Sequence, residues 1–318
     1  MARSRLQSLR GEGTYPQGSD PETRAFIRYW FDDYARRQLA ALSYAINAVP
    51  AGGTREALWC CFSRLIIAKQ AGASRAMDLA HSRPHRMFDR APRKPFGLFS
   101  EALERVIEGC VSSHTPERGP IATIKVGDAR RLPVDDESVD LVVSSPPYLN
   151  AIDYLRCSKF SLVWMGFSIN ELRGIRATSI GAEVRARSSF SHDDIIKDLR
   201  LKPALNPRMT GILRRYIEDT ESVLSEVARV LTQRGRAVYV VGENTIRDAY
   251  VPTGRLVARV AEQAGLRVRS RHSRDLQSNR RYLPPPSAGN CLLDGRMRRE
   301  IILTFEKSNP RRARPRHG

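Results

Sequence analysis

The chain has 318 residues, 41% of them apolar and 7% aromatic, which is enough to bury the core of one large or two ordinary domains. It contains no apolar run of membrane-spanning length, and no apolar stretch follows its basic N-terminal residues. We therefore expect a cytoplasmic protein without a secretory signal. Lys and Arg number 53 against 34 Asp and Glu, and the charge of +19 favours a polyanionic partner such as nucleic acid, although a GC-rich genome also enriches arginine.

The first third of the chain is predicted to be helical. Residues 1–20 are polar and rich in glycine, so we expect a flexible leader there. Asp20 followed by Pro21 is typical of a helix start, and apolar residues then recur at helical spacing until Pro50. Helical patterns resume beyond this proline, so the sequence predicts a helical segment over residues 21–118.

Two histidines four residues apart, His81 and His85, raise the question of a metal site. Pro84 interrupts the helix that would place both on one face, and no third ligand is nearby. The five cysteines form no C-x-x-C pair. We expect no metal, and a loop with a structural or substrate-contacting role around the histidines.

From residue 119 onwards, strands and helices alternate. Strands are expected over residues 122–126, 139–143, 237–241, 266–269 and 300–305, and helices over residues 212–231 and 256–264. This alternation predicts a mostly parallel, doubly wound α/β core over residues 119–306. The remaining residues, 307–318, carry five cations and two prolines, which predicts a basic disordered tail.

The run Ser145-Pro146-Pro147-Tyr148 follows the strand expected over residues 139–143. It resembles motif IV of the amino-group DNA methyltransferases. The resemblance implies a Rossmann-like class I methyltransferase sheet, S-adenosyl-L-methionine as cofactor, DNA as substrate and these four residues as the catalytic loop. Its serine form favours N4-cytosine over N6-adenine as the target. RNA-base methyltransferases use similar loops, so an RNA or tRNA substrate is one alternative, and an inactive nucleic-acid-binding remnant is another.

The chemistry of this loop follows from its stiffness. Two consecutive prolines restrict the backbone, so Ser145 and the carbonyl of Pro146 would point in fixed directions. A base amine is a poor nucleophile because its lone pair is delocalised into the ring. Rigid acceptors for its protons would aim the nitrogen at the methyl group, and Tyr148 offers a ring face for an extruded base.

Two further runs fall at the ends of expected strands. Gly127-Asp128-Ala129 resembles the family's cofactor motif, in which an acid accepts a hydrogen bond from the adenine amino group. The resemblance implies that Asp128 and Ala129 bind the cofactor, and an ordinary turn is the alternative. Gly242-Glu243-Asn244 follows the strand over residues 237–241 and would line the same cleft, unless it is only a turn.

Candidate nucleic-acid contacts lie in two places. Beyond the diproline run are Asn150, Tyr154 and Arg156, with Asp153 among them, which contact target or phosphate unless they only cap and pack a helix. Arg280 and Arg281 begin a basic, proline-rich loop between the last two strands, which suits nucleic-acid contact, or is a solvated connection.

The family's glycine-rich cofactor motif, Asp-Pro-Phe-x-Gly-Ser-Gly, does not occur in the sequence. The family's usual order places that motif and two strands ahead of the helices, so the expected sheet is incomplete at its N-terminal strands. A misassigned gene start or a truncation, a second polypeptide that supplies the loop, and an inactive fragment are the three explanations. We expect this chain alone to bind S-adenosyl-L-methionine weakly or not at all.

Overall fold

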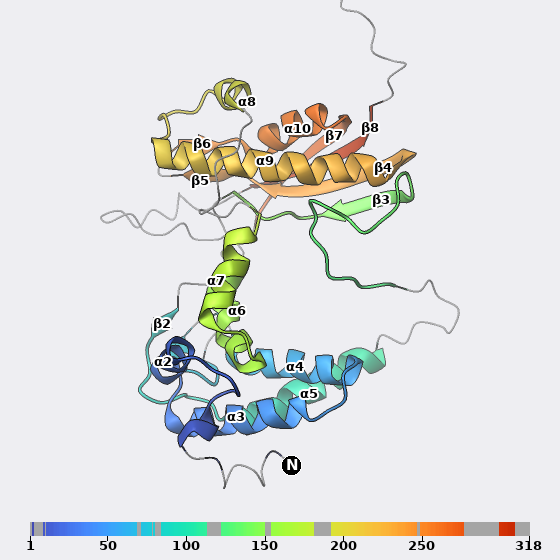
Figure 1. Cartoon of the computed structure of the whole chain (residues 1–318). Coiled ribbons are helices and arrows are strands. Elements are labelled where there is room, and N and C mark those ends of the chain that lie inside the picture. The colour runs from blue at the N-terminus through green and yellow to red at the C-terminus, as the bar shows by residue number, and fades with distance from the viewer. Residues whose placement is uncertain are drawn as a thin grey trace, which may run out of the picture. The chain divides into compact units, whose positions relative to one another are not determined.

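The computed structural model describes residues 2, 9, 11–68, 71–77, 79, 84–112, 122–149, 154–180, 192–246, 249–276 and 299–308. Its internal contacts divide the chain into two units (Figure 1). A helical unit comprises Met1–Ala122 and Asp153–Arg176, and an α/β unit comprises Thr123–Ile152 and Ala177–Gly318. The sequence pattern had assigned all of residues 119–306 to one core, whereas the structure groups Asp153–Arg176 with the N-terminal helices.

The helical unit contains η1 (Gly11–Thr14), α2 (Pro21–Trp30), α3 (Asp33–Asn47), α4 (Gly53–Ile66), α5 (Pro95–Ser112), α6 (Tyr154–Leu162), η2 (Val163–Met165), most of α7 (Ile169–Thr178), and the short strands β1 (Ala76–Met77) and β2 (His85–Arg86). The Asp20 carboxylate accepts hydrogen bonds from the backbone of Glu22 and Thr23, which confirms the predicted helix start. No helix among the described residues is long and apolar enough to cross a membrane.

The continuous helix expected up to Pro50 is wrong. Phe31 has an extended backbone, and the side chain of Asp32 caps a new helix by accepting from the backbone of Tyr34 and Ala35. The apolar periodicity continues across the break because both helices bury residues in one core. Periodicity therefore identified the buried face but not the second helix start.

Aromatic side chains form the centre of the helical unit. Phe160 of α6 makes edge contacts with Phe26 and Trp30 at centroid distances of 5.1 and 4.9 Å, and Trp164 packs edge-on against Phe31 at 5.4 Å. Such arrangements favour contact between ring edges and faces. They explain why residues from Asp153 onwards join the N-terminal helices.

The N-terminal segment is not a loose leader over its described residues. Thr14 is buried, Arg37 donates to the carbonyl oxygen of Leu9 at 3.1 Å, and Arg36 donates to the hydroxyl of Tyr15 at 3.0 Å. These bonds tie residues 9–15 to α3. The segment is polar in composition, yet its described residues are ordered by hydrogen bonds to arginines of α3.

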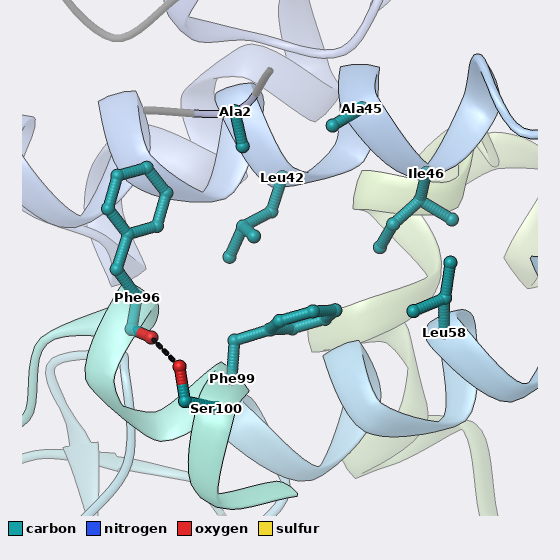
Figure 2. Close-up of a pocket in the computed structure, with 8 residues that line it drawn as sticks. All are labelled: Ala2, Leu42, Ala45, Ile46, Leu58, Phe96, Phe99 and Ser100. Atoms are coloured by element: carbon teal, nitrogen blue, oxygen red, sulfur yellow. Dashed lines mark hydrogen bonds between the residues drawn. The ribbon is translucent and has the colours of Figure 1, made fainter. Parts of the chain in front are cut away.

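A small apolar cavity lies between α3, α4 and α5 (Figure 2). Its volume is about 240 Å³. The hydroxyl of its single polar side chain, Ser100, donates back to the carbonyl of Phe96 at 3.4 Å. The cavity is lined by Ala2, Leu42, Ala45, Ile46, Leu58, Phe96, Phe99 and Ser100. Without an ionisable group, this space does not suit a charged cofactor.

The α/β unit contains β3 (Val139–Ser144), α8 (Asp193–Asp198), α9 (Pro207–Val230), β4 (Leu231–Gly242), β5 (Asn244–Ile246), β6 (Ala249–Val251), α10 (Thr253–Gln263), β7 (Leu266–Asp275) and β8 (Arg299–Lys307). The main sheet has the strand order β3-β4-β8-β7. β3 is parallel to β4, whereas β8 is antiparallel to both of its neighbours. The predicted α/β class is confirmed with a mixed sheet, in which β3, β4 and β7 run one way and β8 opposes them.

Alternation along the strands explains which face is covered. In β4 the residues Ala237, Tyr239 and Val241 are buried, and their register partners in β8 are Phe305, Leu303 and Ile301. These side chains share one core with α9 and α10, which pack on each other and on the sheet (Figure 1). Val238 and Val240 point to the opposite face, where they are only half-buried.

The strand expected over residues 122–126 is wrong. These residues form no regular structure, and Ile124 and Val126 are 95% and 104% exposed. A strand needs a neighbour for its backbone hydrogen bonds, and this segment has none among the described residues. β3 has only β4 beside it in the described sheet, and its Leu141 and Val143 are 58% and 70% exposed.

A carboxylate on α9 holds the loop that precedes β3. Glu226 accepts a hydrogen bond from the backbone of Leu132 at 2.7 Å, and two from Arg229. Arg229 also donates to the carbonyl oxygens of Leu132 and Val134, and pairs with Asp136 at 2.5 Å. These bonds lower the pKa of Glu226 from 4.5 to about 2, mainly through Arg229.

The Glu226→Gln variant should have a lower urea midpoint at neutral pH, because Leu132 and Arg229 lose a charged acceptor. The folded pKa lies below the unfolded one, so this stabilisation is complete above about pH 4.5 and is lost as the pH falls towards about 2. Urea unfolding across this range should show the two proteins converging. Glu218→Gln, on the same helix, is the control, and a midpoint difference that stays constant with pH would refute the assignment.

Candidate active site

The diproline loop leaves the carboxyl end of β3 and is anchored just after Tyr148. Leu149 is 1% exposed and belongs to the core beneath α9. Asn244, which follows the end of β4, donates its side-chain amide to the carbonyl of Leu149 at 2.7 Å. The run Gly242-Glu243-Asn244 therefore lies against the loop, as its position at the strand end had suggested. Ligands in α/β sheets bind at this edge.

Ser145 is exposed, and its hydroxyl oxygen lies within hydrogen-bonding distance of two groups. Its Oγ lies 3.3 Å from the carbonyl oxygen of Val240, to which it donates, and 3.4 Å from the Oη of Tyr148. A hydroxyl has one proton and two lone pairs. With the proton directed to either neighbour, an outward lone pair of Ser145 stays available to accept from an amine.

Tyr148 is half-buried and is held by a charged pair. Its hydroxyl donates to Glu300 of β8 at 2.8 Å, and Arg274 of β7 donates to the other oxygen of Glu300 at 2.7 Å. Burial, followed by the contact with Glu300, raises the pKa of Tyr148 to about 12. The ring is therefore neutral at physiological pH, and the hydrogen bond restricts its orientation.

A second buried carboxylate lies at the same edge. Glu243 is 8% exposed and accepts from the hydroxyl of Tyr250 at 2.7 Å and from the backbone of Gly254 at 3.3 Å. A Cβ on Gly254 would approach Glu243 to 3.0 Å and Ile301 to 2.9 Å, so a larger residue would displace this carboxylate. Glu243 directly follows Gly242, the register partner of Glu300. Glu243 therefore lies against α10 and Tyr250 at the carboxyl end of β4, whereas Glu300 holds Tyr148.

Asp128 occupies a separate cluster with Arg130. The guanidinium of Arg130 donates to both carboxylate oxygens at distances of 2.7 to 3.2 Å, and the Arg130 backbone adds a bond of 2.9 Å. Arg130 also pairs with Asp219 of α9 at 2.9 Å. Its bond to Asp128 is the main reason that the pKa of Arg130 is raised. The carboxylate expected to read an adenine is thus bonded to an arginine, with Ala129 beside it in the same turn.

The remaining candidates lie outside the described residues or in the helical unit. Asn150, Asp153, Arg280, Arg281 and His81 lie outside the described residues. Tyr154 begins α6 and Arg156 is half-buried within it, so both belong to the helical unit, whereas the diproline loop belongs to the α/β unit. Within the described ranges, no group of three His, Cys, Asp or Glu residues could hold a metal ion.

Sequence reasoning missed Glu300 and Arg274. Glu300 has the same strand parity as Ile302, on the face of β8 opposite to the α9 and α10 core, and Arg274 is one of several arginines in β7. The available signal was the position of Glu300 as the first residue of the strand expected over residues 300–305, which is otherwise mostly apolar. The partner, Tyr148, is 152 residues away in sequence, so no local pattern could pair them.

Comparison with known proteins points to DNA methyltransferases. No family model matches the sequence. Over 135 residues the chain is 27% identical to the type II methyltransferase M.BsoBI of Geobacillus stearothermophilus, and the match covers 42% of this chain and a quarter (25%) of that protein. The match thus spans less than half of this chain and a quarter of the length of that methyltransferase.

Crystal structures of TTHA0409 from Thermus thermophilus, assigned as a DNA modification methylase, superpose on the chain at 18% identity. One has a TM-score of 0.30 and covers 57% of this chain and 51% of that chain. A second, in complex with S-adenosyl-L-methionine, has a TM-score of 0.31 and covers 58% and 52%. Scores at this level do not establish a common overall fold.

If Glu300 holds Tyr148, the two side chains should be energetically coupled. The Tyr148→Phe and Glu300→Gln variants and their double variant should show a coupling free energy of about 1 kcal/mol, within the usual range for residues in direct contact. Urea unfolding of the four proteins measures it. Tyr239→Phe, a buried tyrosine on the opposite face of β4, is the matched control and should be additive with Glu300→Gln. Additivity in the Tyr148 cycle would rule out the contact.

Proposed function

We propose that the chain is the base-binding part of an S-adenosyl-L-methionine-dependent DNA methyltransferase that modifies an exocyclic amino group, with N4 of cytosine favoured over N6 of adenine. The observation that carries the proposal is the geometry of Ser145 and Tyr148 at the carboxyl end of β3, fixed by Val240 and Glu300. The partial identity to a type II methyltransferase supports it.

The chain's own residues are sufficient to bind and orient the target base. Ser145 accepts a hydrogen bond from one N–H of the amine and the carbonyl of Pro146 accepts one from the other, so the nitrogen lone pair is less delocalised into the ring. Tyr148, neutral and hydrogen-bonded, stacks on the extruded base. The carboxylate of Glu300, bonded to Tyr148, favours the positive charge that develops on the nitrogen.

The described residues fit the cofactor less well than they fit the target base. S-adenosyl-L-methionine supplies the methyl group when it is bound, and Asp128 is the residue proposed to bind its adenine. In this structure that carboxylate is bonded to Arg130, so it offers no unoccupied charged acceptor. The sequence also contains no glycine-rich cofactor motif. Asp128 and Ala129 therefore need a further element to form a cofactor site.

We propose that a second polypeptide supplies this element by pairing with the edge of β3. In the described sheet β3 has a neighbour, β4, on one side only. The side chains of its Leu141 and Val143 are exposed, and Ile124 and Val126 in the preceding segment are more exposed still. An apolar strand edge of this kind is a template for a further strand. A strand added beside β3 would reach the carboxyl end where Ser145 begins.

Methylation of DNA is favoured over two alternatives. An RNA-base methyltransferase would use the same loop, and the similarity to a type II methyltransferase argues for DNA. A non-catalytic nucleic-acid-binding remnant would not require Ser145 and Tyr148 to be oriented by hydrogen bonds. The positive charge of the chain suits all three, so charge does not separate them.

Deletion of the gene in its source organism should remove N4-methylcytosine, or N6-methyladenine, from a defined genomic sequence. Chromosomal Ser145→Ala and Tyr148→Ala variants should lose about 100-fold or more of the methylation rate, the order for a positioned catalytic group. Single-molecule sequencing measures DNA methylation, and nucleoside mass spectrometry measures RNA. Ser222→Ala and Tyr34→Ala are matched controls. An unchanged DNA methylome with altered RNA would favour the RNA alternative, and no change in either would refute catalysis.

The purified chain should bind S-adenosyl-L-methionine with a Kd well above the micromolar range, because the carboxylate of Asp128 is engaged by Arg130. Calorimetry tests this, and micromolar binding would contradict it.

Leu141→Lys should leave the urea midpoint of the purified chain unchanged, since Leu141 is 58% exposed, but should abolish methylation in cells. Ile107→Lys, which also replaces an exposed apolar side chain by lysine but lies in α5, is the matched control, and equal losses from both variants would contradict strand addition.

A further inference from the structure

A cluster of arginines surrounds Tyr15 in the helical unit. The Cζ atoms of Arg24 and Arg36 lie over its ring, 5.9 and 5.2 Å from the centroid, and Arg28 reaches its hydroxyl from α2. Together with Arg75 they line a cavity of about 540 Å³. The full lining is Gly11, Thr14, Tyr15, Arg24, Arg28, Phe31, Asp33, Arg36 and Arg75.

The hydrogen bonds within this cluster leave a donor directed at no protein group. Arg28 donates its Nε to the Oη of Tyr15 at 3.3 Å, and Arg36 donates to the same oxygen at 3.0 Å. A phenol oxygen has two lone pairs and one proton. Both lone pairs are thus occupied by cationic donors, and across the described residues no acceptor receives the proton of Tyr15.

The charge of the cavity is also unbalanced. Among the described residues that line it, Asp33 is the one acidic side chain, and it pairs with Arg36 at 2.7 Å while remaining 70% exposed. Arg75 donates to the backbone carbonyls of Asp89, Arg28 and Tyr29, which are neutral acceptors. Arg28 has no acidic partner in the part of the chain that the structure describes. Arg28 and Arg75 thus have no carboxylate partner among the described residues, and an anion would compensate their charge.

We propose that this arginine cluster is a binding site for a phosphate group. Guanidinium groups present several N–H donors in a planar fork that matches phosphate oxygens, and the Tyr15 hydroxyl adds a neutral donor. The phosphate comes from a nucleic-acid backbone or from a free phosphate compound, because both present the same oxygens. The site lies wholly in the helical unit and does not depend on methyl transfer.

The elements around the cluster hold its arginines in place. It is built by residues 11–15, by α2 and by the start of α3, where the Asp32 cap turns the chain between the two helices. Phe31, which also lines the cavity, is fully buried, so the arginines extend from a closely packed part of the helical unit. An arginine held in this way loses less side-chain freedom when it binds an anion than one on a mobile surface.

The test compares Arg28→Gln with Arg90→Gln in the full purified chain. Arg28 contacts the Tyr15 hydroxyl, and Arg90 is an exposed arginine of the same unit, so both variants lose one charge. Thermal unfolding is followed in sodium phosphate and in sodium chloride at equal ionic strength. Stabilisation by phosphate should be lost in Arg28→Gln and in Tyr15→Phe and retained in Arg90→Gln.

Fluorescence anisotropy with a labelled DNA duplex, and with labelled ATP, identifies the source of the phosphate. For a backbone site, Arg28→Gln should weaken duplex binding about tenfold and reduce the salt slope by about one, whereas Arg90→Gln should change affinity less than about twofold. For a free phosphate compound, the loss should appear with ATP and not with the duplex. Equal behaviour of Arg28→Gln and Arg90→Gln in all three assays would overturn the site.

Discussion

The position of the diproline loop depends on one buried carboxylate. Glu300 is 9% exposed, and a charge removed from water is costly unless it is paired and hydrogen-bonded. Its two oxygens are satisfied by Tyr148 and by Arg274. The requirement to satisfy Glu300 therefore fixes the tyrosine. With two prolines between them, the orientation of Tyr148 and the direction of Ser145 are linked.

The sheet supports this arrangement from below. β4 offers the carbonyl of Val240 to Ser145, and its continuation offers Asn244 to the carbonyl of Leu149. The loop is thus bonded at its first residue, at its tyrosine and just beyond it. Because these partners come from β4 and β8, any change that shifts the register of that antiparallel pair would displace the loop as a whole.

The β3 edge of the sheet, together with the segment before it, carries exposed apolar side chains. β3 and the segment before Asp128 carry apolar side chains that the described chain leaves exposed, while Arg130 joins Asp128 to α9. Glu226 and Arg229 hold the intervening loop against the same helix. The proposed base-binding side is thus built from internal contacts, and the proposed cofactor side is anchored but has a strand edge without a neighbour among the described residues.

The sequence by itself determined the elements whose causes are local. Asp20 caps a helix because its side chain reaches the next backbone amides, and the long α9 follows from its apolar face. The diproline run indicated the chemistry, because stiffness is a property of neighbouring residues. Only the tertiary structure decided that residues 122–126 form no strand, and that Glu300 and Arg274 hold Tyr148. Pairing of strands and satisfaction of buried charge depend on partners far away in the chain, and no local pattern encodes them.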